Sequence, residues 1–489
     1  MALGVAMAAP AFAKDPPVKD TLVLGMPVEP PGLDPTVAAP TAIREVVWNN
    51  LFEGLVTLDE GGHVKPLLAK SWSVSADGLS YTFALQPGVR FHNGTPFDSG
   101  VVRFTLDRAR APASTNAQKQ FFEPIDAIET PDPLTAVVKL KHPVGLFLYD
   151  LAWGDAVMVD PKTVDTNRTD PVGTGPFRFK AWQRGDHVDL ERNPDYWRAG
   201  VPALRAVTFR FIGDANAQAA ALKAGDIDGF PNFSAPELFG AFAQDDRFTT
   251  ATGKTPRKLV AGLNCRVAPL SDVRVRRALM SAIDRVGVMQ AAYSGFGAPI
   301  GSHYAPSDPG YIDTTGVMPF DVAKAKALLA EAGLPDGFAL TMKVPQMAET
   351  TRTAEVLQAM LGDIGVKLSL VPTEFPARWI DEVFLKHDFG VTAIDHAEPM
   401  DIGIYARPDY YFGYRNPNFD ALVTEADRTA DPAARDRLMG QAQTILANDV
   451  PALYLFDLPR LGIWKKGLEG LWADEPLPQT LVTGARWAP

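Results

Sequence analysis

The segment from residue 338 to residue 371 constrains the fold more than any other part of the chain. Residues 338–344 (FALTMKV) and 365–371 (GVKLSLV) have the composition of strands, and residues 350–363 between them have a helical pattern. A strand, a helix and a second strand in this order make a βαβ unit, whose strands pair in parallel through a right-handed crossover. This region is therefore predicted to be α/β.

The same alternation of helix and strand continues on both sides of this unit. Asp321 is placed to cap a helix that runs to Ala332, and a helix over 432–447 leads into the apolar strand 451–456. Residues 271–286 carry apolar side chains at helical spacing. The C-terminal half of the chain thus has the texture of an α/β domain.

The N-terminal half is different, because residues 68–106 consist of short alternating runs separated by turn residues. Asn93-Gly94 favours the positive φ of a tight hairpin turn. We find no internal repeat and no low-complexity linker between the halves. Any connection between two domains is therefore expected to be short and ordered.

Composition restricts the class of partner. The 489 residues carry a net charge of −11, with 46% hydrophobic and 21% charged residues, and Lys/Arg-rich runs are missing. These values are typical of a globular protein of two or three domains and argue against nucleic acid as a partner.

The first residues predict export. Residues 1–13 (MALGVAMAAPAFA) resemble the end of a secretory signal peptide, with small residues before the cleavage point. No other apolar run approaches the ~20 residues that cross a bilayer. The single cysteine, Cys265, cannot form an internal disulfide. We expect a mature protein that does not span the membrane, located in a Gram-negative periplasm.

The sequence gives little support for catalysis. It lacks a nucleophile elbow, a P-loop, a zinc-peptidase motif and a C-x-x-C pair. Gly173-Thr174-Gly175 is followed by a proline and an alternating strand, not by the helix that a dinucleotide site needs. The seven histidines do not have the i, i+4 spacing of a helical metal site. We expect no enzyme activity, no cofactor and no metal.

The stretch 393–414 (AIDHAEPMDIGIYARPDYYFGY) gathers four carboxylates, one histidine and four tyrosines. Three interpretations are open: a metal site of Asp395, His396, Glu398 and Asp401, a catalytic carboxylate pair, or a wall of a binding pocket. Pro399 and the lack of a nucleophile motif favour the pocket wall.

Six segments together resemble the family 5 (cluster C) solute-binding proteins of ABC importers, which are receptors for peptides, nickel chelates, opines and oligosaccharides. They occur in the family's order over almost the whole mature chain. The segments are LAKSWSVSADGLSYTFALQPGVRFHNGTPF (68–97), GTGPFRFKAWQRGDHVDLERNPDYW (173–197), ALKAGDIDGF (221–230), LNCRVAPLSDVRVRRALMSAIDR (263–285), AKALLAEAGLPDGF (325–338) and RNPNFDALVTEA (415–426).

This resemblance implies a two-lobed periplasmic binding protein with mixed α/β lobes, in which the lobes close over a ligand. Lobe I would comprise residues 20–262 plus 469–489, with an extra hairpin-rich subdomain at about 50–170, and lobe II residues 263–468. The hinge would consist of two strand-like crossings near residues 260 and 468.

The resemblance also implies the function and the partners. A receptor of this kind captures a peptide or peptide-like small molecule and delivers it to an inner-membrane ABC permease. A nickel chelate, an opine or an oligosaccharide remains an alternative ligand, and a secreted hydrolase a remote alternative. We expect a monomer, because the two lobes must move freely.

The family pattern suggests which residues contact the ligand. Asp395 corresponds to the aspartate that binds the ligand's α-ammonium in peptide receptors. In the family's dipeptide receptors, an arginine soon after the strand that matches 338–344 binds the ligand carboxylate. Here that segment reads VPQMAETTR, and its only arginine, Arg352, comes several residues later, which argues against a standard dipeptide as the ligand. The remaining expected pocket residues are His396, Glu398, Asp401, Tyr405, Tyr411, Tyr414, Arg378 and Trp379 from lobe II, and Glu29, Trp48 and Trp153 from lobe I.

Overall fold

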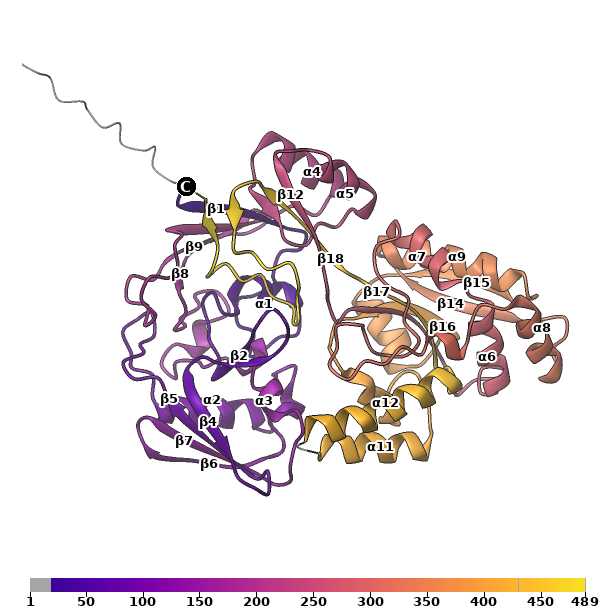
Figure 1. Cartoon of the computed structure of the whole chain (residues 1–489), viewed down its shortest axis with the longest axis horizontal. Helices are drawn as coiled ribbons and strands as arrows, with labels where there is room; N and C mark the ends of the chain where they lie inside the picture. Colours follow the sequence, from indigo (N-terminus) through magenta and orange to yellow (C-terminus); the bar gives the residue numbers. More distant parts are fainter. Residues whose placement is uncertain (1–18, 430, 489) are drawn as a thin grey trace, which may run out of the picture.

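The computed structural model describes residues 19–429 and 431–488 of the chain. The leader predicted at residues 1–13 lies outside the described residues. The chain folds into two α/β lobes that are connected by extended strands near the middle of the molecule (Figure 1). The predicted fold class, a two-lobed mixed α/β protein, is therefore confirmed.

Lobe I is built on a seven-stranded sheet in the order β12-β18-β11-β1-β10-β9-β8, in which β1 is parallel to β10 and β11. Helices α4 and α5 pack their apolar faces on β11 and β18, and α1 precedes the subdomain. The elements are β1 (Thr21–Met26), α1 (Thr41–Val47), β8 (Phe177–Gln183), β9 (His187–Arg192), β10 (Ala206–Phe211), α4 (Ala215–Ala224), β11 (Gly229–Phe230), α5 (Pro236–Ala243), β12 (Phe248–Gly253) and β18 (Arg460–Lys465).

The predicted hairpin-rich subdomain is an antiparallel four-stranded sheet in the order β4-β5-β7-β6. Buried and half-buried residues alternate along β5 and β7, as expected for strands with one face on a core. The elements are β2 (Val56–Leu58), β3 (Val64–Pro66), β4 (Ala69–Val74), β5 (Ser80–Leu85), α2 (Ser99–Arg110), β6 (Ile125–Asp132), β7 (Thr135–Leu140) and α3 (Phe147–Asp150).

Gly173 and Gly175, just before β8, allow the chain to pack directly against the backbone of residues 50–51, which follow α1. A Cβ atom on Gly173 would lie 1.9 Å from the carbonyl oxygen of Leu51, and one on Gly175 would lie 2.5 Å from that of Asn50. The backbone N–H of Gly175 donates a hydrogen bond to Leu51 O (2.9 Å). The Gly-Thr-Gly motif therefore serves packing, in agreement with its interpretation as a turn.

Lobe II contains a five-stranded sheet in the order β15-β14-β16-β13-β17. The predicted βαβ unit is confirmed, because β14 pairs in parallel with β15 and α9 connects them. The elements are β13 (Lys258–Leu263), α6 (Val273–Ser281), α7 (Arg285–Tyr293), α8 (Val322–Glu331), β14 (Ala339–Pro345), α9 (Ala348–Gly362), β15 (Lys367–Thr373), α10 (Ala377–Trp379), a π-helical turn (Ile380–Leu385), β16 (Val391–His396), α11 (Pro417–Asp427), α12 (Pro432–Asp449) and β17 (Ala452–Asp457).

Helix 271–286 was predicted as one element and is two. The first helix, α6, ends at Ser281, and Asp284 caps α7 by accepting a hydrogen bond from the backbone N–H of Val286. A second capping carboxylate inside the apolar repeat thus starts a new helix.

The predicted lobe boundaries require a correction. Strand β13 lies in the lobe II sheet, so the chain changes lobe between residues 253 and 258, before the predicted boundary at 262. It returns between residues 457 and 460, because β18 belongs to the lobe I sheet, and not at 468. Both crossings are short extended segments between paired strands, which have no composition signal of their own.

The lobes touch on both sides of the space between them. The backbone N–H of Gly145 in lobe I donates to Asp427 O in lobe II (2.7 Å). At the other side Arg352 and Glu237 form an exposed ion pair (3.4 Å). No helix of the described residues is long and apolar enough to cross a bilayer.

Candidate ligand-binding site

A cavity of about 560 Å³ lies between the lobes beside the hinge, and we call it the hinge-side cavity. Its lobe II wall includes residues that follow the neighbouring strands β14 and β16, which are parallel to each other. Ligands often bind at this edge of an α/β sheet. The lining residues are Pro27, Val28, Pro40, Thr41, Ala42, Glu45, Asn232, Ser234, Pro256, Arg257, Tyr293, Met347, Glu349, Phe375, Asp395, Ala397, Glu398, Leu458, Glu475 and Pro478.

Asp395 lines this cavity, as predicted, but its carboxylate is already paired. Its Oδ2 accepts hydrogen bonds from Arg257 Nε (2.9 Å) and Nη2 (2.7 Å), while Oδ1 has no hydrogen-bond donor among the described residues. Burial alone would lower the pKa of Arg257, but Asp395 outweighs burial and raises it. The pairing uses Oδ2 and leaves the second carboxylate oxygen, Oδ1, for a ligand.

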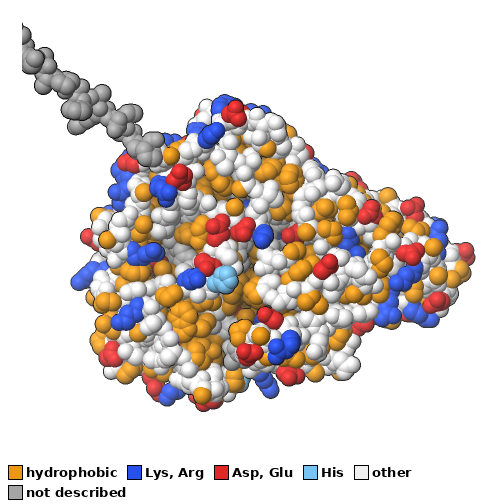
Figure 2. Space-filling view, viewed as in Figure 1, with side chains coloured by type: hydrophobic (Ala, Val, Ile, Leu, Met, Phe, Trp, Pro, Cys, Tyr) orange, Lys and Arg blue, Asp and Glu red, His pale blue; other side chains and the backbone are white. Residues whose placement is uncertain are grey.

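Four further carboxyl groups, those of Glu45, Glu349, Glu398 and Glu475, line the hinge-side cavity and make it acidic. Burial, with a contribution from Glu475, raises the pKa of Glu45 to about 7. Burial also raises the pKa of Glu349. Arg460, with Nε 4.0 Å from Glu475 Oε2, balances only one of these acids. In Figure 2, several acidic side chains lie near the middle of the molecule, beside Lys or Arg side chains and a histidine. A cationic group is the natural complement of this cavity.

A second cavity of about 620 Å³ lies between the subdomain of lobe I and helices α11 and α12 of lobe II, and we call it the far-side cavity. Glu398 lines both cavities and Asp401 lines the second, as expected for pocket residues. The lining residues are Ala117, Gln118, Gln120, Phe121, Pro124, His142, Val144, Leu146, Tyr149, Asp150, Trp153, Phe384, Glu398, Pro399, Met400, Asp401, Gly403, Ile404, Arg407, Tyr410, Asp427, Arg435 and Met439.

Asp401 belongs mainly to a buried polar cluster behind the cavities. Its Oδ1 accepts a hydrogen bond from Lys258 Nζ (2.9 Å), and Lys258 is fully buried. Burial would raise the pKa of Asp401, but Lys258 and His303 hold it well below its usual value. Lys258 also donates to Glu398 O (2.6 Å). This network fixes the start of the segment that carries the acidic residues.

Two histidines complete the buried cluster. His303 Nε2 lies 3.1 Å from Asp401 Oδ1, and His396 Nδ1 lies 3.5 Å from Asp401 Oδ2. The other ring nitrogens contact tyrosine hydroxyls: His303 Nδ1 lies 3.1 Å from Tyr405 Oη and His396 Nε2 2.9 Å from Tyr411 Oη. His396 therefore packs behind the cavities and does not line either.

The donor atoms of His303, His396 and Asp401 lie within 4.8 Å of one another, which is compatible with a metal ion. The ammonium of Lys258 already occupies the cation position on Asp401. Because a divalent ion beside that ammonium would be repelled, the arrangement suits the lysine better than a metal. Lys258 and Asp401 form an internal ion pair, and the imidazoles of His303 and His396 lie beside its carboxylate.

The tyrosines of the acidic stretch require a correction. Tyr405, Tyr411 and Tyr414 are at most 4% exposed and line neither cavity. They pack with Phe412 and Phe419 in a core of lobe II, where Tyr405 stacks on Phe412 with ring centroids 4.3 Å apart. These aromatic rings pack in the core. Of the four tyrosines in the stretch 393–414, only Tyr410 lines the far-side cavity.

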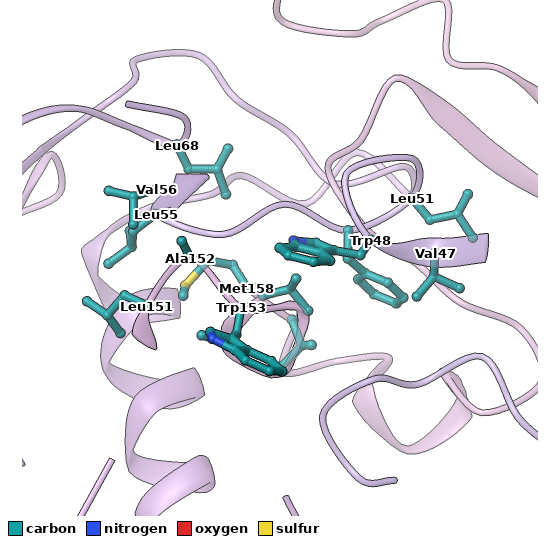
Figure 3. Packing of buried hydrophobic residues seen from close by; sticks show 14 of the residues in the cluster. Val47, Trp48, Leu51, Leu55, Val56, Leu68, Leu151, Ala152, Trp153 and Met158 are labelled. Atoms are coloured by element: carbon teal, nitrogen blue, oxygen red, sulfur yellow. The ribbon is translucent and has the colours of Figure 1, made fainter. Parts of the chain in front are cut away.

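The two tryptophans expected from lobe I behave differently. Trp48 is 1% exposed and lies inside the lobe I core with Val47 and Leu51 (Figure 3), so it has a packing role. Trp153 is 3% exposed and lies nearby in the same core, yet it also lines the far-side cavity. Trp153 therefore remains a candidate ligand contact.

Three further predicted residues lie away from both cavities. Glu29 accepts hydrogen bonds from Trp182 Nε1 (3.0 Å) and Gly185 N (3.1 Å), although Val28 beside it lines the hinge-side cavity. Arg378 donates to Glu382 (2.6 Å) on the surface. Trp379 is buried and donates to Thr392 Oγ1 (2.9 Å). Their hydrogen bonds are explained by local structure.

Sequence reasoning missed several lining residues. Arg257 lies in the first crossing, and Glu475 follows the second, so the position of the hinge was the signal that could have identified them. Glu45 lies on the short helix α1 and gave no signal. The cavity thus contains an arginine, although not at the position where the family's peptide receptors carry one.

The chain is similar in sequence to one known family of binding proteins. Residues 63–401 match the family described as bacterial extracellular solute-binding proteins, family 5 Middle. The glutathione-binding protein GsiB of Pectobacterium atrosepticum is 30% identical over 474 residues, which cover 92% of this chain and 90% of that protein.

Solved structures agree with this assignment. The protein AgaA of A. tumefaciens R10, in complex with agropinic acid, superposes with a TM-score of 0.82 at 27% identity, covering 96% of this chain and 99% of that one. The oligopeptide-binding protein AppA of Bacillus subtilis, in complex with a nonapeptide, gives a TM-score of 0.82 at 25% identity, with 97% and 100% covered. The chain belongs to the bacterial extracellular solute-binding proteins of family 5.

Proposed function

We propose that this protein is the periplasmic receptor of an ABC importer and that its ligand is a peptide or peptide-like molecule with an ammonium group. The acidic hinge-side cavity carries the proposal, because Asp395 Oδ1 has no donor among the described residues and the carboxyl groups of Glu45 and Glu349 face the same space. A charge-assisted hydrogen bond to an ammonium is stronger than a neutral one.

The relatives support this class of ligand. GsiB is named for glutathione, AppA was solved with a nonapeptide and AgaA with agropinic acid. These are amino-acid-derived molecules with charged ends. We also propose that the protein is exported by its leader, is a monomer and delivers the ligand to an inner-membrane permease. The residues that line the hinge-side cavity do not include the nucleophile and base pair of a hydrolase.

The test uses a pool of tripeptides with free termini, the same pool after N-acetylation, and reduced glutathione. Bound masses are read by native mass spectrometry and affinities by calorimetry. We expect binding of free peptides near micromolar dissociation constants, about −8 kcal/mol, and at least tenfold weaker binding of acetylated ones. Equal binding of both pools would remove the ammonium requirement, and no binding of any probe would overturn the proposal.

A further inference from the structure

The guanidinium of Arg435, on the first turn of α12, is a buried cation without a hydrogen-bonded anion. The residue is 4% exposed, and its Nε and Nη2 have no acceptor among the described residues. Its Nη1 contacts the sulfur of Met400 at 4.0 Å and Asp436 Oδ1 at 3.8 Å, which are both beyond a good hydrogen bond. Donors on a buried charge are rarely left in this state.

Arg435 lines the far-side cavity and belongs to lobe II, whereas the opposite wall comes from lobe I. The buried hydroxyl of Tyr304 lies beside the guanidinium and makes no hydrogen bond of good geometry to any other described residue. Unused donors therefore point to one place, where an acceptor with more than one oxygen would satisfy them.

Asp150 of α3, on the lobe I side of the same cavity, does not neutralise Arg435. No oxygen of Asp150 lies within 4.0 Å of a described basic nitrogen, and its side chain has no hydrogen bond to the described residues. Burial raises the pKa of Asp150 well above its usual value, against the opposing effect of Arg435. Because no oxygen of Asp150 contacts the guanidinium, the donors of Arg435 remain available to an anion.

The remaining walls of the cavity are suited to an organic ligand and not to a bare ion. Besides Arg435, the cavity is lined by Arg407 and by the carboxyl groups of Asp150, Glu398, Asp401 and Asp427. Aromatic and other apolar side chains make up much of the remaining wall, as is usual for a small-molecule pocket. These side chains are Phe121, Tyr149, Trp153, Phe384, Tyr410, Ile404 and Met439.

We propose that Arg435 binds the carboxylate end of the ligand, with the two oxygens accepting parallel hydrogen bonds from the guanidinium. This inference rests on the proposed function, since the ammonium end of the same peptide-like molecule lies in the hinge-side cavity. Glu398 lines both cavities, so one extended ligand passes it. A guanidinium fork matches a carboxylate in shape as well as in charge.

The site also explains how the family's missing arginine is replaced. Asp395 pairs with Arg257 through two hydrogen bonds, whereas within the described part of the chain the carboxylate nearest to Arg435 is that of Asp436, 3.8 Å from Nη1. Its position in lobe II opposite the lobe I wall means that a bound carboxylate is enclosed only when the lobes are together. The ligand carboxylate would bind the closed form of the protein more tightly than the open form, and it would thereby favour closure of the lobes.

The experiment compares the free tripeptide pool with the same pool carrying C-terminal amides, on the wild-type protein, on Arg435→Gln and on Arg437→Gln. Arg437 is an exposed arginine two residues further along α12 and serves as the matched control. We expect the wild-type protein and R437Q to prefer free acids at least tenfold, and R435Q to lose that preference.

Each outcome of this experiment supports or overturns one of the two proposals. If free acids and amides bind the wild-type protein equally, or if R435Q keeps the preference, the Arg435 subsite is overturned while the proposed function stands. If neither pool binds, the proposed function fails first. Should R435Q not fold, Arg435→Lys retains the charge without the fork, and a preference reduced severalfold supports the site whereas an unchanged one overturns it.

Discussion

Arg257 and Lys258 are consecutive residues, and each forms an ion pair with an acid of the segment 393–414. One ion pair lies in the cleft and the other is buried behind it. Arg257 pairs with Asp395 in the cleft, where the two side chains are 25% and 17% exposed. Lys258, fully buried, pairs with Asp401 behind the cleft. Strand geometry explains the contrast, because neighbouring side chains point to opposite faces. Similar ion pairs can thus serve recognition on one face and the architecture of the lobe on the other.

Replacing Lys258 is the strongest test of the contrast between the two ion pairs. Lys258→Met leaves Asp401 buried without its cation, and removing one member of a buried pair costs about 3–5 kcal/mol. We expect the urea midpoint, followed by tryptophan fluorescence, to fall accordingly. The double variant K258M/D401N should recover part of the loss because no uncompensated charge remains. A loss below about 1 kcal/mol would show that the cluster is not structural.

Periodicity was sufficient to predict the βαβ unit at residues 338–371, because β14, α9 and β15 are local patterns. The position of Asp395 in the cleft followed from the family pattern. Its pairing with Arg257 joins residues 138 positions apart, and such a contact leaves no local trace.

The tyrosines show most clearly which features of the site could not be predicted from the sequence. Tyr410 lines the far-side cavity and its neighbour Tyr411 is a core residue, although both have the same type and context in the sequence. A lysine in the fully buried strand KLVAGL was a usable signal, because such a residue needs a buried anion. It would have indicated that one acid of the chain is buried opposite this lysine and is therefore not a ligand contact.

The second prediction concerns His303 in the buried cluster. Burial lowers the pKa of His303 to about 3, although Asp401 opposes this effect. The unfolded chain takes up the proton near pH 6.5 and the folded chain does not, so stability falls as the pH decreases from 6.5 toward 3. Between pH 7 and pH 5 this group contributes a loss of about 2 kcal/mol.

His303→Asn should flatten that part of the pH dependence in urea titrations at pH 7, 6 and 5, whatever its effect on stability at pH 7. His63→Gln is the control, because the His63 side chain is 75% exposed. Equal slopes in the wild-type protein and H303N would contradict the buried neutral imidazole.

The third prediction addresses the cleft pair. Asp395→Asn removes the charge that faces the ligand ammonium, and we expect affinity for the tightest-binding free tripeptide to fall about tenfold, or about 1.4 kcal/mol. The same change should cost less than about 1 kcal/mol of stability, because the pair is partly solvated. Calorimetry and urea unfolding on one preparation separate the two effects. A stability loss as large as that of K258M would erase the contrast between the two ion pairs.

The smallest expected effect concerns Glu45, whose pKa burial raises to about 7 with a contribution from Glu475. A bound ammonium favours the ionised form of Glu45, so affinity should rise about threefold from pH 5.5 to pH 7, where half of this group is still protonated in the free protein. The α-ammonium of the peptide stays protonated in this range, since its pKa is about 8. Glu45→Gln should give a flat profile, while Glu331→Gln on the exposed face of α8 should keep the wild-type slope. If E45Q retained the rise, the acid that titrates with binding would lie elsewhere in the cavity, and Glu349, whose pKa burial also raises, would be the next carboxyl to replace.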